Sequence, residues 1–299
     1  HKPGMVIHTA GWPCNESNTG GGGFMYHLEN NQVSLGFISE LSYSNPYYSP
    51  FDEMQRWKLH PVIKRYLHGG KRIAYGARAI AKGGPQSLPS MVFKGGLIIG
   101  CDAGTLVNAK IKGSHTAMKS GMLAAETIHG AITGQNTKEQ LIEYDQVFRS
   151  SWAYKELWQQ RNWGPARHRW GDLFGSAVGY LDVNFLHGRL PFTLRDRKPD
   201  HECLLQATEC QPIDYPKPDG VYTFSKLDSV YLSNTFHGED QPCHLTLVDP
   251  AIPVRQCVPE YQEPAQRYCP AGVYEIIRNE VGDLRFQINS QNCVHCKTC

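Results

Sequence analysis

The chain has 299 residues, of which 40% are hydrophobic and 19% are charged, so a mainly disordered protein is excluded. Lys and Arg number 30 against 28 Asp and Glu, and the net charge of +2 argues against a dedicated nucleic-acid surface. The sequence holds no run of eighteen apolar residues, so we expect no simple transmembrane helix. It starts at His1 without a targeting segment and stops at Cys299 within a cysteine cluster, so we expect a fragment of a longer protein.

The first third of the chain predicts β structure followed by a helix. Alternation over Phe24–Leu28, a turn at Asn30-Asn31 and a second apolar run over Val33–Ile38 predict a hairpin. Phe51–Trp57 has the pattern of a short helix, and Lys71–Tyr75 has the pattern of a further strand.

Four glycines, Gly20 to Gly23, precede the first predicted strand. Without side chains, their backbone groups are open to hydrogen bonding, for example with a quinone carbonyl. A flexible turn before the strand explains them equally simply, and the residues alone favour that interpretation.

A strand, a loop and a helix are predicted between residues 97 and 134. Leu97–Ile99 is apolar and ends in a glycine-containing turn with Asp102, and a helix begins near Ser114. A carboxylate after a strand and a helix start near Gly113 suit a dinucleotide, because the helix N-terminus attracts a pyrophosphate. An ordinary strand–loop–helix explains the same residues. The glycine fingerprint of a dinucleotide fold is absent, as expected if its first half lies outside this chain.

A second helical region is predicted over Lys138–Arg161, and the following stretch to Lys198 mixes aromatic residues with arginines. Such a mixture is typical of a segment at a membrane interface, although a core helix with solvated arginines fits as well. The arginines concerned are Arg161, Arg167, Arg169, Arg189, Arg195 and Arg197. The polar, proline-rich Asp196–Asp219 predicts a linker. Short strands are predicted beyond it over His244–Val248, Val273–Ile277 and Leu284–Ile288.

The last cysteines carry the strongest signal. Cys293, Cys296 and Cys299 repeat at intervals of three, and Cys269 is followed by a proline, a combination typical of the four thiolates around a [4Fe–4S] cube. The predicted hairpin between them would return the chain to the same centre. The alternative is a structural zinc site that combines the three clustered cysteines with Cys269 or His295.

Six segments closely resemble the electron transfer flavoprotein–ubiquinone oxidoreductase family. They are Asn45–Phe51, Gln55–Lys58, Gly69–Ala79, Lys110–Gly121, Tyr215–Gly220 and Asn292–Cys299. The similarity runs through nearly the whole chain, which corresponds to the C-terminal part of that family.

The resemblance implies an α+β protein with a β-sheet-rich quinone-binding region, the second half of a Rossmann-like FAD domain, and a small ferredoxin-like [4Fe–4S] domain. We place the ubiquinone-binding region at residues 1–75 and the FAD-binding part at 76–135. A helical, membrane-associated segment follows at 136–198, within which residues 170–186 align with a membrane-inserting stretch. The cluster domain takes 199–299.

The resemblance also implies functional residues. By motif position, Cys269, Cys293, Cys296 and Cys299 are cluster ligands, and Gly21 and Gly22 contact the quinone. The FAD-contacting positions are Asp102, Gly113, His115, Thr116 and Ala117. No side chain is expected to act as a catalytic nucleophile, since catalysis of this kind consists of positioning and redox tuning.

The function that the resemblance implies is that of an electron-transferring-flavoprotein dehydrogenase. Electrons from reduced electron transfer flavoprotein pass through the cluster and FAD to ubiquinone, linking fatty-acid and amino-acid oxidation to the respiratory chain. The enzyme is expected on the matrix face of the mitochondrial inner membrane, or on the bacterial cytoplasmic membrane, as a monotopic protein. Two alternatives remain: a soluble flavin reductase of the FixC or geranylgeranyl-reductase type with a ferredoxin-like domain, and a non-enzymatic zinc-binding module.

Overall fold

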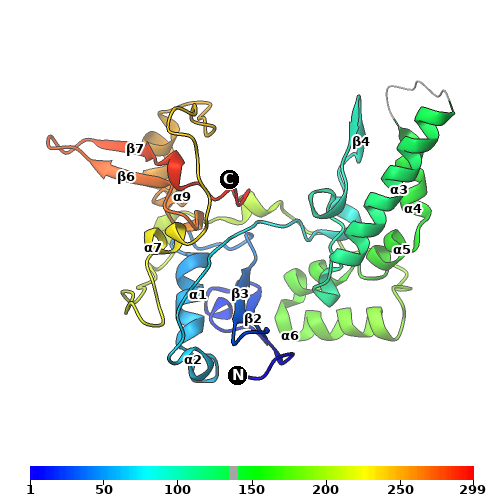
Figure 1. The fold of residues 1–299 in the computed structure, drawn as a ribbon, viewed down its shortest axis with the longest axis horizontal. Helices are drawn as coiled ribbons and strands as arrows, with labels where there is room; N and C mark the ends of the chain where they lie inside the picture. Colours follow the sequence, from blue (N-terminus) through cyan, green and yellow to red (C-terminus); the bar gives the residue numbers. More distant parts are fainter. Residues whose placement is uncertain (135–140) are drawn as a thin grey trace. The chain divides into compact units, whose positions relative to one another are not determined.

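The computed structural model describes residues 1–134 and 141–299. It divides into two compact units: unit 1 consists of His1–Ala79 with Lys198–Cys299, and unit 2 of Ile80–Arg197. Each unit combines helices with a small sheet (Figure 1), in agreement with the expected α+β class. The predicted division into four regions stays a prediction, and residues 135–140 of it lie outside the described part.

Unit 1 is built on an antiparallel sheet of order β1-β2-β3, formed by Val6–Ala10, Gly21–His27 and Val33–Ser39. The predicted hairpin is confirmed. Its turn uses Asn30 and Asn31 with φ of 54° and 57°, a conformation that asparagine tolerates better than most residues. The interpretation of the glycine run as a flexible turn is wrong, because β2 already begins at Gly21.

The glycines of β2 are required by close packing. Gly22 pairs with Ala10 on one side and Ile38 on the other, and a Cβ at Gly22 would strike the carbonyl of Thr9. A Cβ at Gly23 would overlap the indole of Trp57. Glycine inside a strand marks such close approaches.

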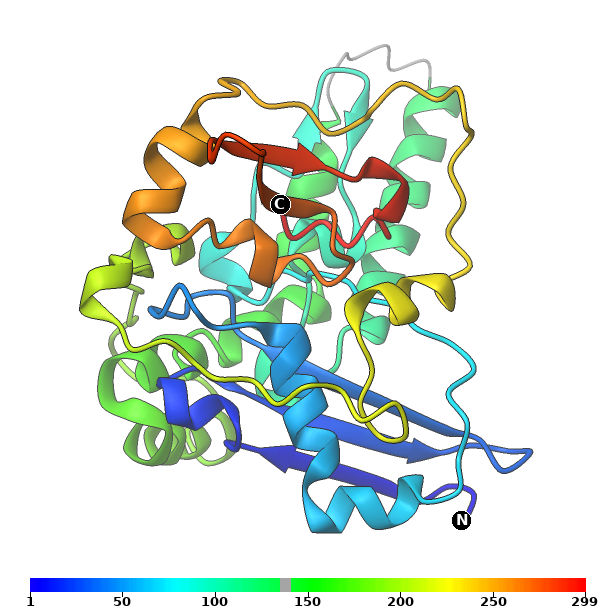
Figure 2. The same ribbon diagram turned by 90° about the vertical axis from the view of Figure 1, so that its left-hand side faces the viewer.

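Two helices complete this half of unit 1, α1 over Pro50–Leu59 and α2 over Pro61–Leu67. The helix predicted at Phe51–Trp57 is confirmed. Helix α1 lies across the sheet (Figure 2) and buries Trp57 against Met25.

The strand predicted over Lys71–Tyr75 is wrong, since these described residues are extended but pair with no strand. They lie along the helix α7, Lys226–Tyr231, instead. Arg72 donates to the Ser229 hydroxyl at 2.6 Å, and the Tyr75 N–H donates to the Leu232 carbonyl at 3.2 Å. An extended pattern alone does not reveal whether a sheet edge is available.

The predicted linker Asp196–Asp219 is attached to unit 1 from residue 198 onward. The Leu205 N–H donates to the Ser44 carbonyl at 2.8 Å, and the Tyr215 hydroxyl donates to the buried Glu53 carboxylate at 2.8 Å. This part of the chain is therefore ordered and packs against α1.

The C-terminal part of unit 1 contains short helices and a hairpin. The elements after α7 are a π-helical turn at Pro253–Cys257, α8 (Val258–Tyr261), α9 (Ala265–Tyr268), β6 (Tyr274–Arg278) and β7 (Leu284–Ile288). The predicted strands at Val273–Ile277 and Leu284–Ile288 are confirmed as this hairpin. No strand forms over His244–Val248, a described segment whose Val248 is fully exposed.

Unit 2 is mainly helical. Its elements are the two-residue strands β4 (Val92–Phe93) and β5 (Gly96–Leu97), then α3 (Ser114–Thr133), α4 (Ile142–Ser150), α5 (Trp152–Gln159) and α6 (Trp163–Asn184). The helix predicted from Ser114 is confirmed and ends before Gly134.

Two predictions for unit 2 need correction. The strand expected over Leu97–Ile99 is reduced to a β4–β5 turn, so Ile98 and Ile99 lie outside it. The single helical region Lys138–Arg161 is two helices, because the Ser151 hydroxyl caps α5 by accepting from the Tyr154 N–H. Residues 138–140 of that prediction lie outside the described part. Tyr144, Phe148 and Leu157 form the core of this unit.

We predict that Gly23→Ala destabilises unit 1, because the added methyl group would force the Trp57 indole out of its place. Overpacking of this kind costs about 1–3 kcal/mol, so the thermal unfolding midpoint should fall measurably in calorimetry. Gly76→Ala is the control, since among the described residues no atom lies within 4 Å of the Cβ it would add. Equal midpoints for the two variants would contradict the packing argument.

Candidate metal centre and ligand-binding regions

The cysteine run forms a tight curl after the short 3-10 turn Ser290–Asn292. His295 and Lys297 have φ of 52° and 65°, so left-handed residues alternate with the cysteines. The N–H of His295 points to the Cys293 sulfur at 3.4 Å. Alternation of this kind turns successive backbone N–H groups toward a common centre and makes a concavity suited to an anionic cluster.

The β6–β7 hairpin brings the remote cysteine to this curl. Cys269 directly follows α9 and is 5% exposed, and Cys293 packs against the same buried cluster. The Asn289 N–H donates to the Val273 carbonyl at 2.7 Å, and the Asn292 amide donates to the Gly272 carbonyl at 3.3 Å. Residues on both sides of the hairpin are thereby tied together, and the expected proximity of Cys269 to the run is observed.

Three tyrosines surround the thiols. Burial raises the pKa of Tyr75, Tyr268 and Tyr274, and the charge of Cys269 raises each further. Cys296 acts in the same way on Tyr75, and Cys299 acts on the other two. Three of the four thiols, Cys269, Cys296 and Cys299, thus act on the same tyrosines and lie in one region of unit 1.

The tyrosine hydroxyls remain protonated donors. Tyr274 donates to the Cys299 sulfur at 3.3 Å, and Tyr75 donates to the Pro270 carbonyl at 2.9 Å. Burial raises the pKa of the Cys269 thiol, while the N–H groups of Val273 and Ala271 oppose the rise. These donors are available to stabilise a thiolate or an inorganic sulfide.

Residues 75–79 form a further wall of this centre. The Ala79 N–H donates to the Cys296 carbonyl at 2.7 Å, close to the bond from Tyr75 to Pro270. Sequence reasoning missed this contribution because it assigned Lys71–Tyr75 to a strand. Residues 75–79 lie more than 200 positions before the cysteine run in the sequence.

The arrangement favours the predicted cluster over the alternative of a structural zinc site. Zn–S bonds of about 2.3 Å would place thiolates roughly 4 Å apart. In the described part of the chain, the His and Cys ligand atoms that lie within 4.8 Å of one another belong to His244, Cys293 and His295. That set lacks Cys269, Cys296 and Cys299. A cube instead binds each thiolate to a separate iron, and a set of four cysteines around a concave backbone suits it.

His244 was not expected near this centre. The rings of His237, His244 and His295 lie with centroids 4.9–5.4 Å apart, and His237 donates to the Cys293 carbonyl at 2.8 Å. These side chains lie around Cys293. The Cys293 sulfur therefore belongs both to the set formed with His244 and His295 and to the cysteine centre. The loop that carries His237 and His244 offers no motif from which the contact follows.

The proposed quinone-contacting glycines lie in the central strand of the unit 1 sheet. Gly22 is buried, whereas Gly21 is half-buried and its carbonyl accepts from the Gly11 N–H at 3.2 Å. The hydrogen bonds of the sheet therefore occupy part of the backbone that the sequence interpretation left available to a quinone carbonyl. A hollow of about 330 Å³ lies in the same unit, lined by Trp12, Arg56, Leu59, His60, Pro61 and Pro216.

The proposed FAD-contacting residues of unit 2 gather at the start of α3. Gly113 is its N-cap and provides no capping side chain, so the first N–H groups of a 20-residue helix are open to an anion. Thr116 donates to the Thr105 carbonyl at 2.6 Å, and His115 bonds to Glu156 at 2.9 Å. Asp102 is exposed on the turn Gly100–Ala103.

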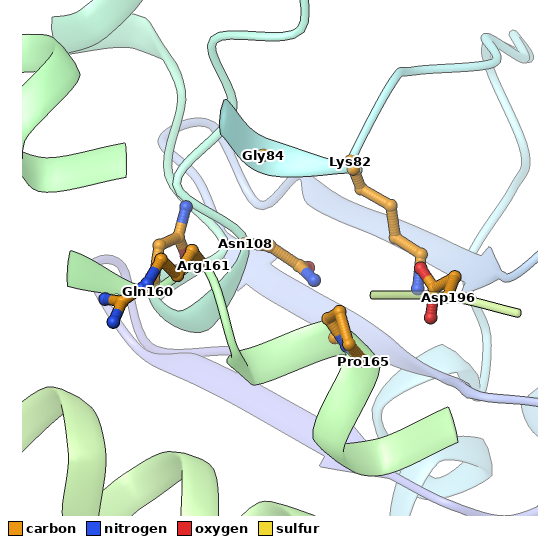
Figure 3. A pocket seen from close by; sticks show the side chains of 9 residues that line it. Lys82, Gly84, Asn108, Gln160, Arg161, Pro165 and Asp196 are labelled. Atoms are coloured by element: carbon orange, nitrogen blue, oxygen red, sulfur yellow. The ribbon is translucent and has the colours of Figure 1, made fainter. Parts of the chain in front are cut away.

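A small hollow beside α6 does not extend this region. Lys82, Asn108, Gln160, Arg161 and Asp196 line it (Figure 3), and its volume is about 30 Å³, enough for very few water molecules. A flavin cannot enter it.

The arginine-rich stretch is ordered around α6. Arg161 fits neither of the two interpretations of this stretch, a membrane interface or a solvated arginine, because it is 5% exposed and its five donors bond within unit 2. The acceptors are the Thr193 hydroxyl and the carbonyls of Trp158, Gly188, Leu190 and Phe192.

The second half of α6, after the left-handed Gly171, presents large apolar side chains to solvent. Leu173 and Phe174 are 91% and 62% exposed, and Phe185, the C-cap directly after the helix, is 66% exposed. Within the described residues, each helix is too short or too polar to cross a membrane.

Two family models match the chain. Residues 1–80 match the ubiquinone-binding model of ETF-QO, and residues 220–299 match the model of electron transfer flavoprotein-ubiquinone oxidoreductase, 4Fe-4S. The second match supports a ferredoxin-like [4Fe–4S] domain around the cysteine centre.

Curated relatives match over the full chain. The chain is 62% identical over 300 residues to the electron transfer flavoprotein-ubiquinone oxidoreductase of Pseudomonas aeruginosa, and covers 54% of it. It is 52% identical over 318 residues to a probable counterpart in Acinetobacter baylyi, covering 55%. It is 51% identical over 308 residues to the human mitochondrial protein, covering 50%. The chain thus spans about half of the length of these relatives.

We predict that Cys269→Ala abolishes iron binding, because the curl would lose its remote ligand and leave one iron without a thiolate. Iron and acid-labile sulfide per chain should both fall to background after reconstitution. Cys257→Ala is the matched control, as burial also raises the pKa of this half-buried thiol. Zinc in place of iron in the wild-type chain would contradict the assignment.

Proposed function

Because the chain belongs to the electron transfer flavoprotein–ubiquinone oxidoreductase family, we propose that it is the quinone- and cluster-binding part of an enzyme that oxidises reduced electron transfer flavoprotein and reduces ubiquinone. The observation that carries this proposal is the convergence of Cys269 with Cys293, Cys296 and Cys299 in unit 1, supported by the two family matches. Ubiquinone takes two electrons and two protons to become ubiquinol.

The four cysteines are the proposed ligands of the cluster, and Asp102, Gly113, His115, Thr116 and Ala117 are the proposed contacts of FAD in the second half of a Rossmann-like domain. A [4Fe–4S] cluster exchanges one electron at a time and FAD exchanges two, which suits a one-electron donor and a two-electron acceptor. The chain's own residues supply positioning. Tyr274 directs a proton to the Cys299 sulfur, and the open start of α3 offers N–H groups to a phosphate.

For the quinone we propose Gly21 and Gly22. Neither residue carries a side chain, so a ring that reaches the start of β2 would contact backbone alone. The match of residues 1–80 to a ubiquinone-binding model supports this region.

We propose peripheral binding to a membrane through the second half of α6. Leu173, Phe174 and Phe185 would enter the headgroup region of one leaflet while the body of the unit stays in water. The membrane would be the cytoplasmic membrane of a bacterium or, on the matrix side, the mitochondrial inner membrane.

We predict that Cys296→Ala in the full-length protein abolishes electron flow from reduced electron transfer flavoprotein to a short-chain ubiquinone. Absorbance at the quinone wavelength measures this flow. Cys243→Ala should retain it, because Cys243 is exposed and lies in the loop before His244. Unimpaired quinone reduction by the Cys296 variant would refute the role of the cluster.

We predict that Leu173→Glu combined with Phe174→Glu weakens binding to anionic liposomes at least tenfold in a flotation assay. Two carboxylates would replace the apolar contact with the leaflet. Val248→Glu, an equally exposed apolar position in unit 1, should leave binding unchanged. Loss of binding in both, or in neither, would argue against α6 as the membrane contact.

A further inference from the structure

Lys226, at the start of α7, turns its ammonium group inward. Nζ donates to the Gln266 carbonyl at 2.7 Å and to the Arg267 carbonyl at 3.3 Å, and it lies 6.0 Å from the centroid of the Phe51 ring. Burial lowers the pKa of Lys226, and the nearby Asp52 and Cys269 favour its charged form. The cation is thus held by neutral carbonyls in a largely desolvated place.

The two carbonyls belong to α9, the helix that delivers Cys269. Cys269 is the C-cap of α9, and its N–H donates to the Ala265 carbonyl at 3.2 Å. Helix α7 also packs closely against the turn after Cys269. A Cβ added at Gly272 in this turn would lie only 3.4 Å from the Leu227 side chain. The Arg267 carbonyl that Nζ contacts lies two residues before Cys269, so the cation lies close to the segment that ends in this cysteine.

We propose that Lys226 sets the reduction potential of the cluster by holding a fixed positive charge beside Cys269. Reduction adds one negative charge to the cluster, and a neighbouring cation stabilises the product more than the reactant. Charges interact more strongly where water is partly excluded, and the side chain of Lys226 is partly buried. Lys226 is therefore a positioning residue that raises the potential, and it need not contact the flavoprotein or the quinone.

This inference rests on the proposed function, because it requires the four-cysteine cluster. It differs from a purely structural role, in which Lys226 would only tie α7 to α9. Removing that tie would affect stability, whereas removing the charge would affect the potential.

The test is a redox titration of the full-length holoprotein, followed by the EPR signal of the reduced cluster. Lys226→Met and Lys226→Gln both remove the charge, and Gln keeps a donor for the α9 carbonyls. Both should make reduction about tenfold less favourable, which is 59 mV for one electron. Lys226→Arg should retain the wild-type potential, and Lys2→Met, which removes an exposed charge from the same unit, should as well.

The outcomes separate the two proposals. Absence of the EPR signal from the wild-type holoprotein would refute the cluster itself. A normal signal with unchanged potentials in Lys226→Met and Lys226→Gln would overturn the role of the lysine alone. A potential that falls in the Met variant but not in the Gln variant would assign the effect to the hydrogen bonds and equally overturn the charge argument.

Discussion

The backbone ladder between β6 and β7 is the constraint on which the metal centre depends. It runs from the Tyr274–Ile288 pair to the Arg278–Leu284 pair, so the chain leaves the centre after Cys269 and comes back just before Cys293. The hydrogen bond between Asn289 and Val273 closes the open end of the hairpin. Without this return, three neighbouring thiols would face solvent, and a fourth would stay buried at the end of α9.

Local sequence was sufficient for the parts of this centre that depend on spacing. The intervals of three among Cys293, Cys296 and Cys299 predicted a curl, and the apolar runs before it predicted the hairpin. The surrounding groups could not be predicted, because Tyr75, His244 and Lys226 come from distant segments whose own sequence does not show what they contact. Their roles follow from tertiary packing, which a pattern of neighbours does not contain.

Elsewhere, helices and hairpins with clear local signals were predicted, whereas isolated strands were not. Phe51–Trp57 follows a start signal in Ser49 and Pro50, and the helix from Ser114 has a stop signal in Gly134. The runs at Lys71–Tyr75 and His244–Val248 are also suited to an extended backbone, but a strand needs a free edge to pair with, and the sequence does not show where one lies. The glycines before Phe24 illustrate the reverse case: they suggested a turn, although Trp57, 34 residues beyond Gly23, makes them part of a strand.

The buried guanidinium of Arg161 has a mechanical consequence for unit 2. By holding the carbonyls of Gly188, Leu190 and Phe192, it fastens the segment that follows α6 to the end of α5. The C-terminal end of α6 is therefore joined through this segment to the helical core of unit 2. A lipid surface that contacted the end of α6 near Phe185 would therefore displace unit 2 as one body.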